Sequence, residues 1–141
     1  MSTEGLLLDT VYVQALLNYR DQHHARALRF APRVRSATGV WVTEAVLIEI
    51  GDALSGSNRA GAAAFIDSCY RTPNITVVPV DTPLLGRALR LYESHTDKEW
   101  GLTDCVSFVV MRDQQLVDAL TADRHFRQAG FHALLLDADE P

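Results

Sequence analysis

Short apolar segments alternate with longer amphipathic segments along this chain, and this alternation restricts its fold more than any other feature. Most of the short segments are nearly continuous runs of Val, Leu and Ile, a pattern typical of strands covered on both faces. The predicted strands are 5–8, 40–42, 75–80, 116–120 and 133–136. Strands that alternate with helices form a parallel sheet, so the pattern predicts an α/β fold with helices on both faces of a five-stranded sheet.

The segments between these strands have helical spacing and recognisable ends. Pro32 predicts the end of the second helix, because the residue before a proline disfavours the helical conformation. Thr43 and Thr103 are N-cap candidates, and Gly130 predicts the end of the last helix. The predicted helices are 10–18, 21–31, 43–54, 59–70, 81–95, 103–113 and 124–129.

Length and composition favour one globular domain over residues 1–141, with a hydrophobic share of 48%. No apolar run approaches the roughly 18 residues of a membrane span, and Leu6–Leu8 lacks the basic flank of a secretory signal. Cys69 and Cys105 form neither a disulfide framework nor a zinc pattern. We therefore expect a cytoplasmic protein without a membrane segment.

The net charge of −5 at first argues against a nucleic-acid partner. If four carboxylates gather around a metal, however, most of that charge belongs to one site. Twelve of the thirteen basic residues are arginine, which suits forked phosphate contacts. Seven basic or titratable residues between positions 20 and 35 form either a phosphate-binding face or a solvated helix face: Arg20, His23, His24, Arg26, Arg29, Arg33 and Arg35.

Acidic residues follow two of the predicted strands, where ligands of open α/β sheets bind. Asp9 ends the first strand and Asp123 follows the fourth, while Asp104 lies in the first turn of a predicted helix. Glu49 borders an apolar stripe, so we expect it to be partly buried, where a lone charge is costly. A hard cation such as Mg²⁺ or Mn²⁺ offsets the mutual repulsion of clustered carboxylates. The alternatives are that Asp9 is a turn residue, that Asp104 is a helix-terminal charge stabilised by the helix dipole, and that Asp123 caps the following helix.

Five segments resemble a PIN-domain nuclease, and more narrowly the VapC-type ribonuclease toxins of bacterial toxin–antitoxin pairs. They are LLLDT, TEAVLIEIGDAL, DKEWGLTDCVSFVVM, ALTADRHFRQAGF and the closing ALLL. The resemblance covers nearly the whole chain in order, and its TDCVSF and TADRHFRQAGF segments are the most specific. It implies a three-layer fold and an endoribonuclease that cleaves RNA phosphodiester bonds with metal-activated water.

The resemblance also implies roles for individual residues. Asp9 and Asp104 would be direct Mg²⁺ or Mn²⁺ ligands, with Glu49 and Asp123 direct or water-bridged. Substrate or water positioning is implied for Thr10, Ser107 and Thr121; Ser107 also follows Asp104 by three residues on one helix face. We interpret His125 and Phe126 as structural, place Trp41 in the core, and leave Trp100 open between base stacking and packing.

Two kinds of partner follow from the resemblance besides RNA. A small antitoxin would cross a groove beside the acids and present an arginine to them, and a homodimer is a further possibility. The groove is expected between the early helices and the helix bearing Glu49, with apolar candidates Val13, Leu16, Leu17, Ala45 and Leu54.

Two rival functions remain at this point. A non-catalytic PIN-like module would keep the fold for RNA or protein contacts. A receiver-like phosphoryl-transfer domain would need a lysine late in the chain. The only lysine is Lys98, which lies before the fourth strand, so the sequence argues against this alternative.

Overall fold

Five parallel strands form the centre of the molecule, in the order β3-β2-β1-β4-β5. The structure is a computed structural model that describes residues 2–137. The strands are β1 (Ser2–Leu8), β2 (Gly39–Thr43), β3 (Ile75–Val78), β4 (Leu116–Leu120) and β5 (His132–Ala133). The helices are α1 (Thr10–Leu17), α2 (His24–Ser36), α3 (Glu44–Leu54), α4 (Arg59–Arg71), α5 (Thr82–Ser94), α6 (Leu102–Asp113), α7 (Arg124–Gln128) and α8 (Leu134–Asp137).

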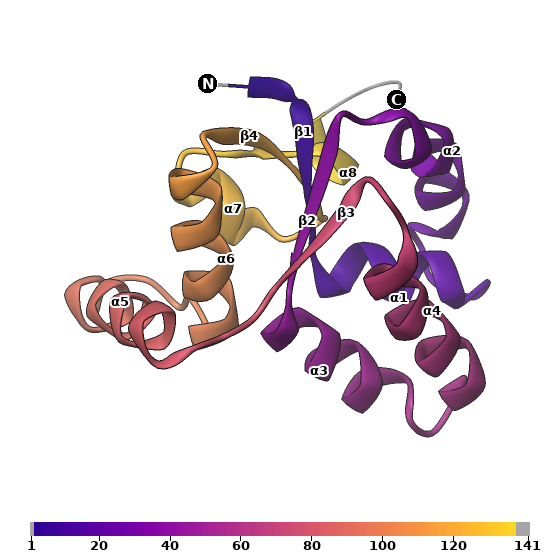
Figure 1. The fold of residues 1–141 in the computed structure, drawn as a ribbon, viewed down its shortest axis with the longest axis horizontal. Helices are drawn as coiled ribbons and strands as arrows, with labels where there is room; N and C mark the ends of the chain where they lie inside the picture. The colour runs from indigo at the N-terminus through magenta and orange to yellow at the C-terminus, as the bar shows by residue number, and fades with distance from the viewer. Residues whose placement is uncertain (1, 138–141) are drawn as a thin grey trace.

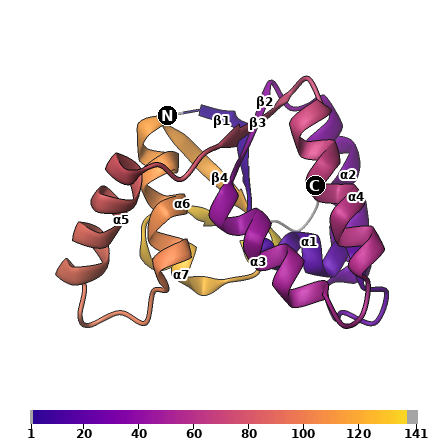
Figure 2. The same ribbon diagram turned by 60° about the horizontal axis from the view of Figure 1, so that its bottom comes forward.

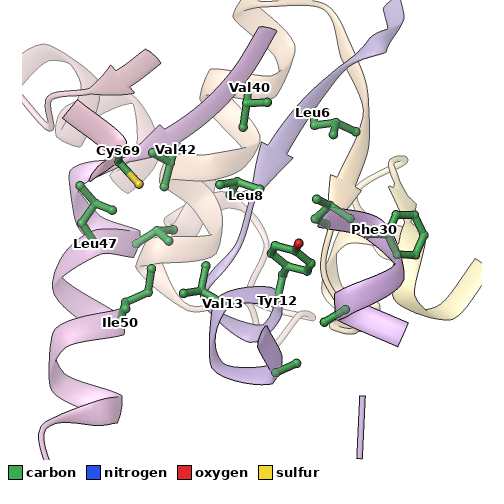
Figure 3. Packing of buried hydrophobic residues seen from close by; sticks show 14 of the residues in the cluster. Leu6, Leu8, Tyr12, Val13, Phe30, Val40, Val42, Leu47, Ile50 and Cys69 are labelled. Carbon is green, nitrogen blue, oxygen red and sulfur yellow. The ribbon is translucent and has the colours of Figure 1, made fainter. Parts of the chain in front are cut away.

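The sheet separates two hydrophobic clusters, because successive side chains of a strand point to opposite faces. Leu6 and Leu8 of β1 pack in one cluster with α1 to α4, whereas Leu7 packs in the other with α5, α6 and α7 (Figure 1). Figure 3 shows the first cluster, in which Tyr12 and Ile50 lie near the strand residues. The predicted α/β class with helices on both faces is confirmed.

None of the helices within residues 2–137 combines the length and apolar character needed to cross a membrane.

The carboxyl ends of β1 and β4 lie side by side at one edge of the sheet. Leu8 pairs with Leu120, and the Asp9 backbone N–H donates to the Leu120 carbonyl at 3.3 Å. The residues that directly follow these two strands are therefore neighbours in space. Figure 2 turns this edge, from which α1 and α3 begin, toward the viewer.

Helix α2 continues through Pro32 to Ser36, so the prediction that it ends before the proline was wrong. Tertiary contacts hold the turn beyond Pro32. Arg33 donates to the buried carboxylate of Asp118 at 2.8 Å, and the Asn74 side chain donates to the Val34 carbonyl at 2.9 Å. These contacts offset the backbone hydrogen bond that a proline cannot donate.

Replacing Pro32 with alanine is expected to raise the free energy of unfolding by about 2 kcal/mol, because alanine restores the missing donor. The matched control is Pro83→Ala in the first turn of α5, where proline suits the helix. Urea denaturation measures both variants. Equal stabilities of the two variants would contradict the cost assigned to Pro32.

Other predicted boundaries also differ from the structure: β1 begins at Ser2 and α2 at His24, and further differences fall at α6, β3 and β5. Gly101 is the N-cap of α6, and Thr103 lies inside its first turn. Strand β3 ends at Val78. Strand β5 is only two residues long, because Leu134–Asp137 form a short helix in which the Asp137 carboxylate accepts a hydrogen bond from the Ala133 N–H at 2.8 Å.

Candidate metal centre

An open cleft of about 660 Å³ lies at the edge where β1 and β4 end, and carboxylates dominate its polar lining. Its residues come from the β1–α1 junction, α3, the start of α6 and the β4–α7 connection. They are Asp9, Thr10, Val11, Gln14, Glu49, Asp52, Ala53, Gly101, Leu102, Thr103, Asp104, Asp123 and His125. All four acids predicted from the sequence therefore line one cleft, together with Thr10.

Asp9 is the most deeply buried of these acids, with 4% of its surface exposed. The Thr121 hydroxyl donates to its Oδ2 at 2.7 Å. Burial is the main cause that raises the pKa of Asp9 to about 7, and the neighbouring charges of Asp104 and Asp123 raise it further. No cationic side chain among the described residues offsets the negative charge of ionised Asp9.

Asp104 is held at the start of α6, where its Oδ2 accepts a hydrogen bond from the Gly101 N–H at 3.1 Å. Burial raises the pKa of this carboxyl group, and the charge of Asp123 adds to the shift, while the hydrogen bond from His125 lowers it. A carboxylate at a helix N-terminus also interacts favourably with the helix dipole. Burial and the charge of Asp123 therefore outweigh the hydrogen-bond donors, and the pKa of Asp104 stays above its usual value.

Asp123 is the N-cap of α7 and accepts a hydrogen bond from the His125 backbone N–H at 2.9 Å. The ring Nδ1 of His125 lies 3.0 Å from Asp104 Oδ2 and 3.3 Å from Asp123 Oδ1. One ligand atom from each of these three residues lies within 4.8 Å of the others, an arrangement that can hold a metal ion. His125, interpreted as structural from the sequence, thus lies in the acidic site.

Glu49 reaches the cleft from α3, and its Oε1 accepts a hydrogen bond from the Thr10 hydroxyl at 2.6 Å. The residue is exposed, so the expectation that it is partly buried beside the apolar stripe was wrong. Its neighbour Ile50 is fully buried, and the helix turns Glu49 toward solvent at the cleft. The cost of burying a lone charge, the basis for predicting Glu49 in the acidic site, therefore does not apply to this residue.

The three smaller polar residues differ in position. Thr10 lines the cleft, whereas Thr121 lies just behind it, fully buried, and also accepts a hydrogen bond from the Asp123 N–H at 3.0 Å. Thr121 therefore connects two of the acids. Ser107 is fully buried in α6 and is not among the cleft residues, and its side-chain hydroxyl has no hydrogen-bond partner within the described part of the chain.

Gln14 and Asp52 line the cleft but were not predicted as site residues. Their sequence signals are weak: Gln14 follows Thr10 by four residues, and Asp52 follows Glu49 by three, so each pair shares a helix face. Trp100 belongs to the core, since it is 6% exposed and its indole N–H donates to Gln128 at 3.0 Å. Packing therefore explains Trp100 better than base stacking does.

The donor set fits a hard divalent cation. Carboxylates from four separate chain segments line the cleft, and among the described residues those lining it include neither lysine nor arginine. Oxygen donors with a single imidazole suit Mg²⁺ or Mn²⁺ better than the sulfur- or histidine-rich sets of structural zinc. The raised pKa of the buried Asp9 agrees with a site that needs a positive ion.

The chain belongs to the PIN domain family, whose model matches residues 6–132. Among solved structures, it is similar to the Mycobacterium tuberculosis toxin VapC20, described as a sarcin–ricin loop cleaving toxin. The TM-score is 0.80 at 26% identity, over 90% of this chain and 96% of that chain. No curated protein matches the chain. The fold and family expected from the sequence are confirmed.

Proposed function

We propose that this protein is an Mg²⁺- or Mn²⁺-dependent endoribonuclease and the toxin of a toxin–antitoxin pair. The observation that carries the proposal is the convergence of Asp9, Asp104 and Asp123 in one cleft, from three segments distant in sequence. The family and the similarity to VapC20 support a nuclease. RNA is the substrate class and an antitoxin the partner that this similarity suggests.

In this proposal, Asp9 and Asp104 bind the cation directly, and Glu49 and Asp123 bind it directly or through water. A bound divalent cation supplies positive charge at the attacked phosphate and lowers the pKa of the attacking water. Thr121 holds Asp9 and the Asp123 backbone together, and Thr10 fixes Glu49. These hydroxyls therefore keep the carboxylates in place before RNA binds.

The basic segment between positions 20 and 35 contributes only in part to a phosphate-binding face. Arg33 pairs with Asp118, and His24 Nδ1 lies 2.7 Å from the Ala15 carbonyl, so both serve the fold. Arg20, Arg29 and Arg35 remain exposed. We propose Arg20 and Arg29 as RNA backbone contacts, whereas Arg35 lies close to the start of β2, at the opposite edge of the sheet from the cleft.

Two of the five apolar residues expected to line the antitoxin groove cannot do so, whereas Leu16, Leu17 and Ala45 are half-buried. Val13 and Leu54 are buried in the first hydrophobic cluster and offer no surface. A groove of about 490 Å³ instead lies between α3 and α4, where Ile48 and Tyr70 are 66% and 56% exposed. Asp52 lines both this groove and the acidic cleft. An apolar antitoxin segment in the groove would place an adjoining arginine near the carboxylates.

Replacing Ile48 with aspartate is expected to weaken antitoxin binding at least about tenfold, because an exposed apolar anchor is replaced by a charge. The matched control is Leu89→Asp on α5, across the sheet and 39% exposed. Titration calorimetry with the product of the adjacent small gene measures both. Equal affinities would exclude the α3–α4 groove as the antitoxin site.

A further inference from the structure

His125 connects the start of α6 with the start of α7 through two different donors. Its backbone N–H donates to Asp123 Oδ1, and its ring Nδ1 lies within hydrogen-bond distance of Asp104 Oδ2 at 3.0 Å. An ionised carboxylate only accepts hydrogen bonds, so next to ionised Asp104 the ring nitrogen Nδ1 must carry the hydrogen and donate. The ring is only 21% exposed, which favours one orientation over free rotation in solvent.

The hydrogen bonds leave one oxygen of each carboxylate unused. Both bonds to Asp104 fall on Oδ2, from the Gly101 N–H and from the His125 ring. Both contacts of Asp123 with His125 fall on Oδ1. Among the described residues, nothing donates to Asp104 Oδ1 or Asp123 Oδ2. These two oxygens are therefore available to a cation.

Loss of the ring would affect the two carboxylates differently. Asp123 keeps the backbone donor whatever side chain stands at position 125. Asp104 keeps only the Gly101 N–H, which belongs to its own helix, and loses its single side-chain bond to α7. A metal ligand held by a second group binds more tightly, because its orientation is fixed before the metal arrives.

We propose that His125 is a positioning residue of the metal site: its Nδ1–H holds Asp104 Oδ2 and thereby presents the other oxygen of Asp104 to the cation beside Asp123. This inference rests on the proposed function, since it assumes that the cleft binds a divalent cation. In this arrangement His125 acts through Asp104 instead of serving as the third ligand that its position would also allow, because Nδ1, the ring nitrogen nearest the acids, carries the hydrogen.

Direct Mn²⁺ binding tests this role without measuring cleavage. Free Mn²⁺ is followed by electron paramagnetic resonance for the wild type and for the variants His125→Leu, His125→Asn and His125→Gln. The leucine variant is expected to bind Mn²⁺ about 10- to 100-fold more weakly. Asparagine places an amide N–H near the position of Nδ1 and is expected to retain most of the affinity, whereas the longer glutamine is not. The matched control is His132→Leu, which lies outside the cleft.

The outcomes separate this inference from the proposed function. A wild type that binds no Mn²⁺ would overturn both. A wild type that binds Mn²⁺, with a folded leucine variant of equal affinity, would overturn only the role of His125. If the leucine variant does not fold by circular dichroism, the asparagine and glutamine variants decide: asparagine well above glutamine supports the role, and equal affinities overturn it.

Discussion

Replacing Asp104 with asparagine is expected to lower the rate of RNA cleavage by about three orders of magnitude, because a metal ligand contributes several kcal/mol to transition-state stabilisation. Asparagine keeps the shape of the side chain and an oxygen that can accept the Gly101 N–H. The loss should therefore come from the missing charge, not from misfolding. The measurement is single-turnover cleavage of a labelled RNA, with ribosomal and transfer RNA both tested as substrates.

Asp97→Asn is the matched control, since Asp97 is a 70% exposed loop carboxylate shortly before α6. Its cleavage rate should equal that of the wild type. Without metal, Asp104→Asn should be at least as stable as the wild type, because burial and the nearby Asp123 charge disfavour the ionised Asp104. Mg²⁺ should then stabilise the variant less than the wild type. Wild-type cleavage by Asp104→Asn, with contaminating nuclease excluded, would remove Asp104 from the site.

The metal-free protein is expected to lose stability as pH rises from about 4 to about 7, because Asp9 has a raised pKa in the folded state. The folded chain holds the Asp9 proton up to about pH 7, whereas the unfolded chain releases it near 3.8. The folded state therefore binds more protons in this window, and its destabilisation is complete above pH 7. The shift from 3.8 to about 7 corresponds to about 4 kcal/mol.

Urea denaturation of the wild type and Asp9→Asn at several pH values measures this effect. The variant cannot ionise at position 9, so its stability should fall less between pH 4 and pH 7 and exceed that of the wild type at pH 8. Mg²⁺ should stabilise the wild type more at pH 8 than at pH 5, since it binds the ionised carboxylates. Equal pH profiles of the two proteins would contradict the raised pKa of Asp9.

The sheet could be predicted from the sequence because its signal is local. Leu116–Leu120 was placed at its observed bounds, and Thr43 is the N-cap of α3 as predicted, with its side chain accepting from the Val46 N–H at 3.2 Å. Contacts between distant segments account for the main errors. The extension of α2 past Pro32 depends on Asp118 and Asn74, which no local pattern connects to that helix.

The gathering of the acids could be predicted in outline, since residues that follow parallel strands share one edge. The separate roles within the cleft could not. Glu49 stands beside a fully buried residue yet is exposed, and only its bond to Thr10 shows how it is held. No local sequence pattern indicated the role of His125, because its partner Asp104 lies 21 residues earlier in the chain.

The central claim, that the acidic cleft hydrolyses RNA with a bound divalent cation, is tested most directly by the ends of the RNA products. Purified protein is incubated with RNA in Mg²⁺ or Mn²⁺ and, separately, in excess chelator. Attack by water leaves the 2′-hydroxyl of the RNA unused, so we predict cleavage only with metal and products without a 2′,3′-cyclic phosphate. Cleavage that persists in chelator and yields cyclic phosphate ends would contradict the account.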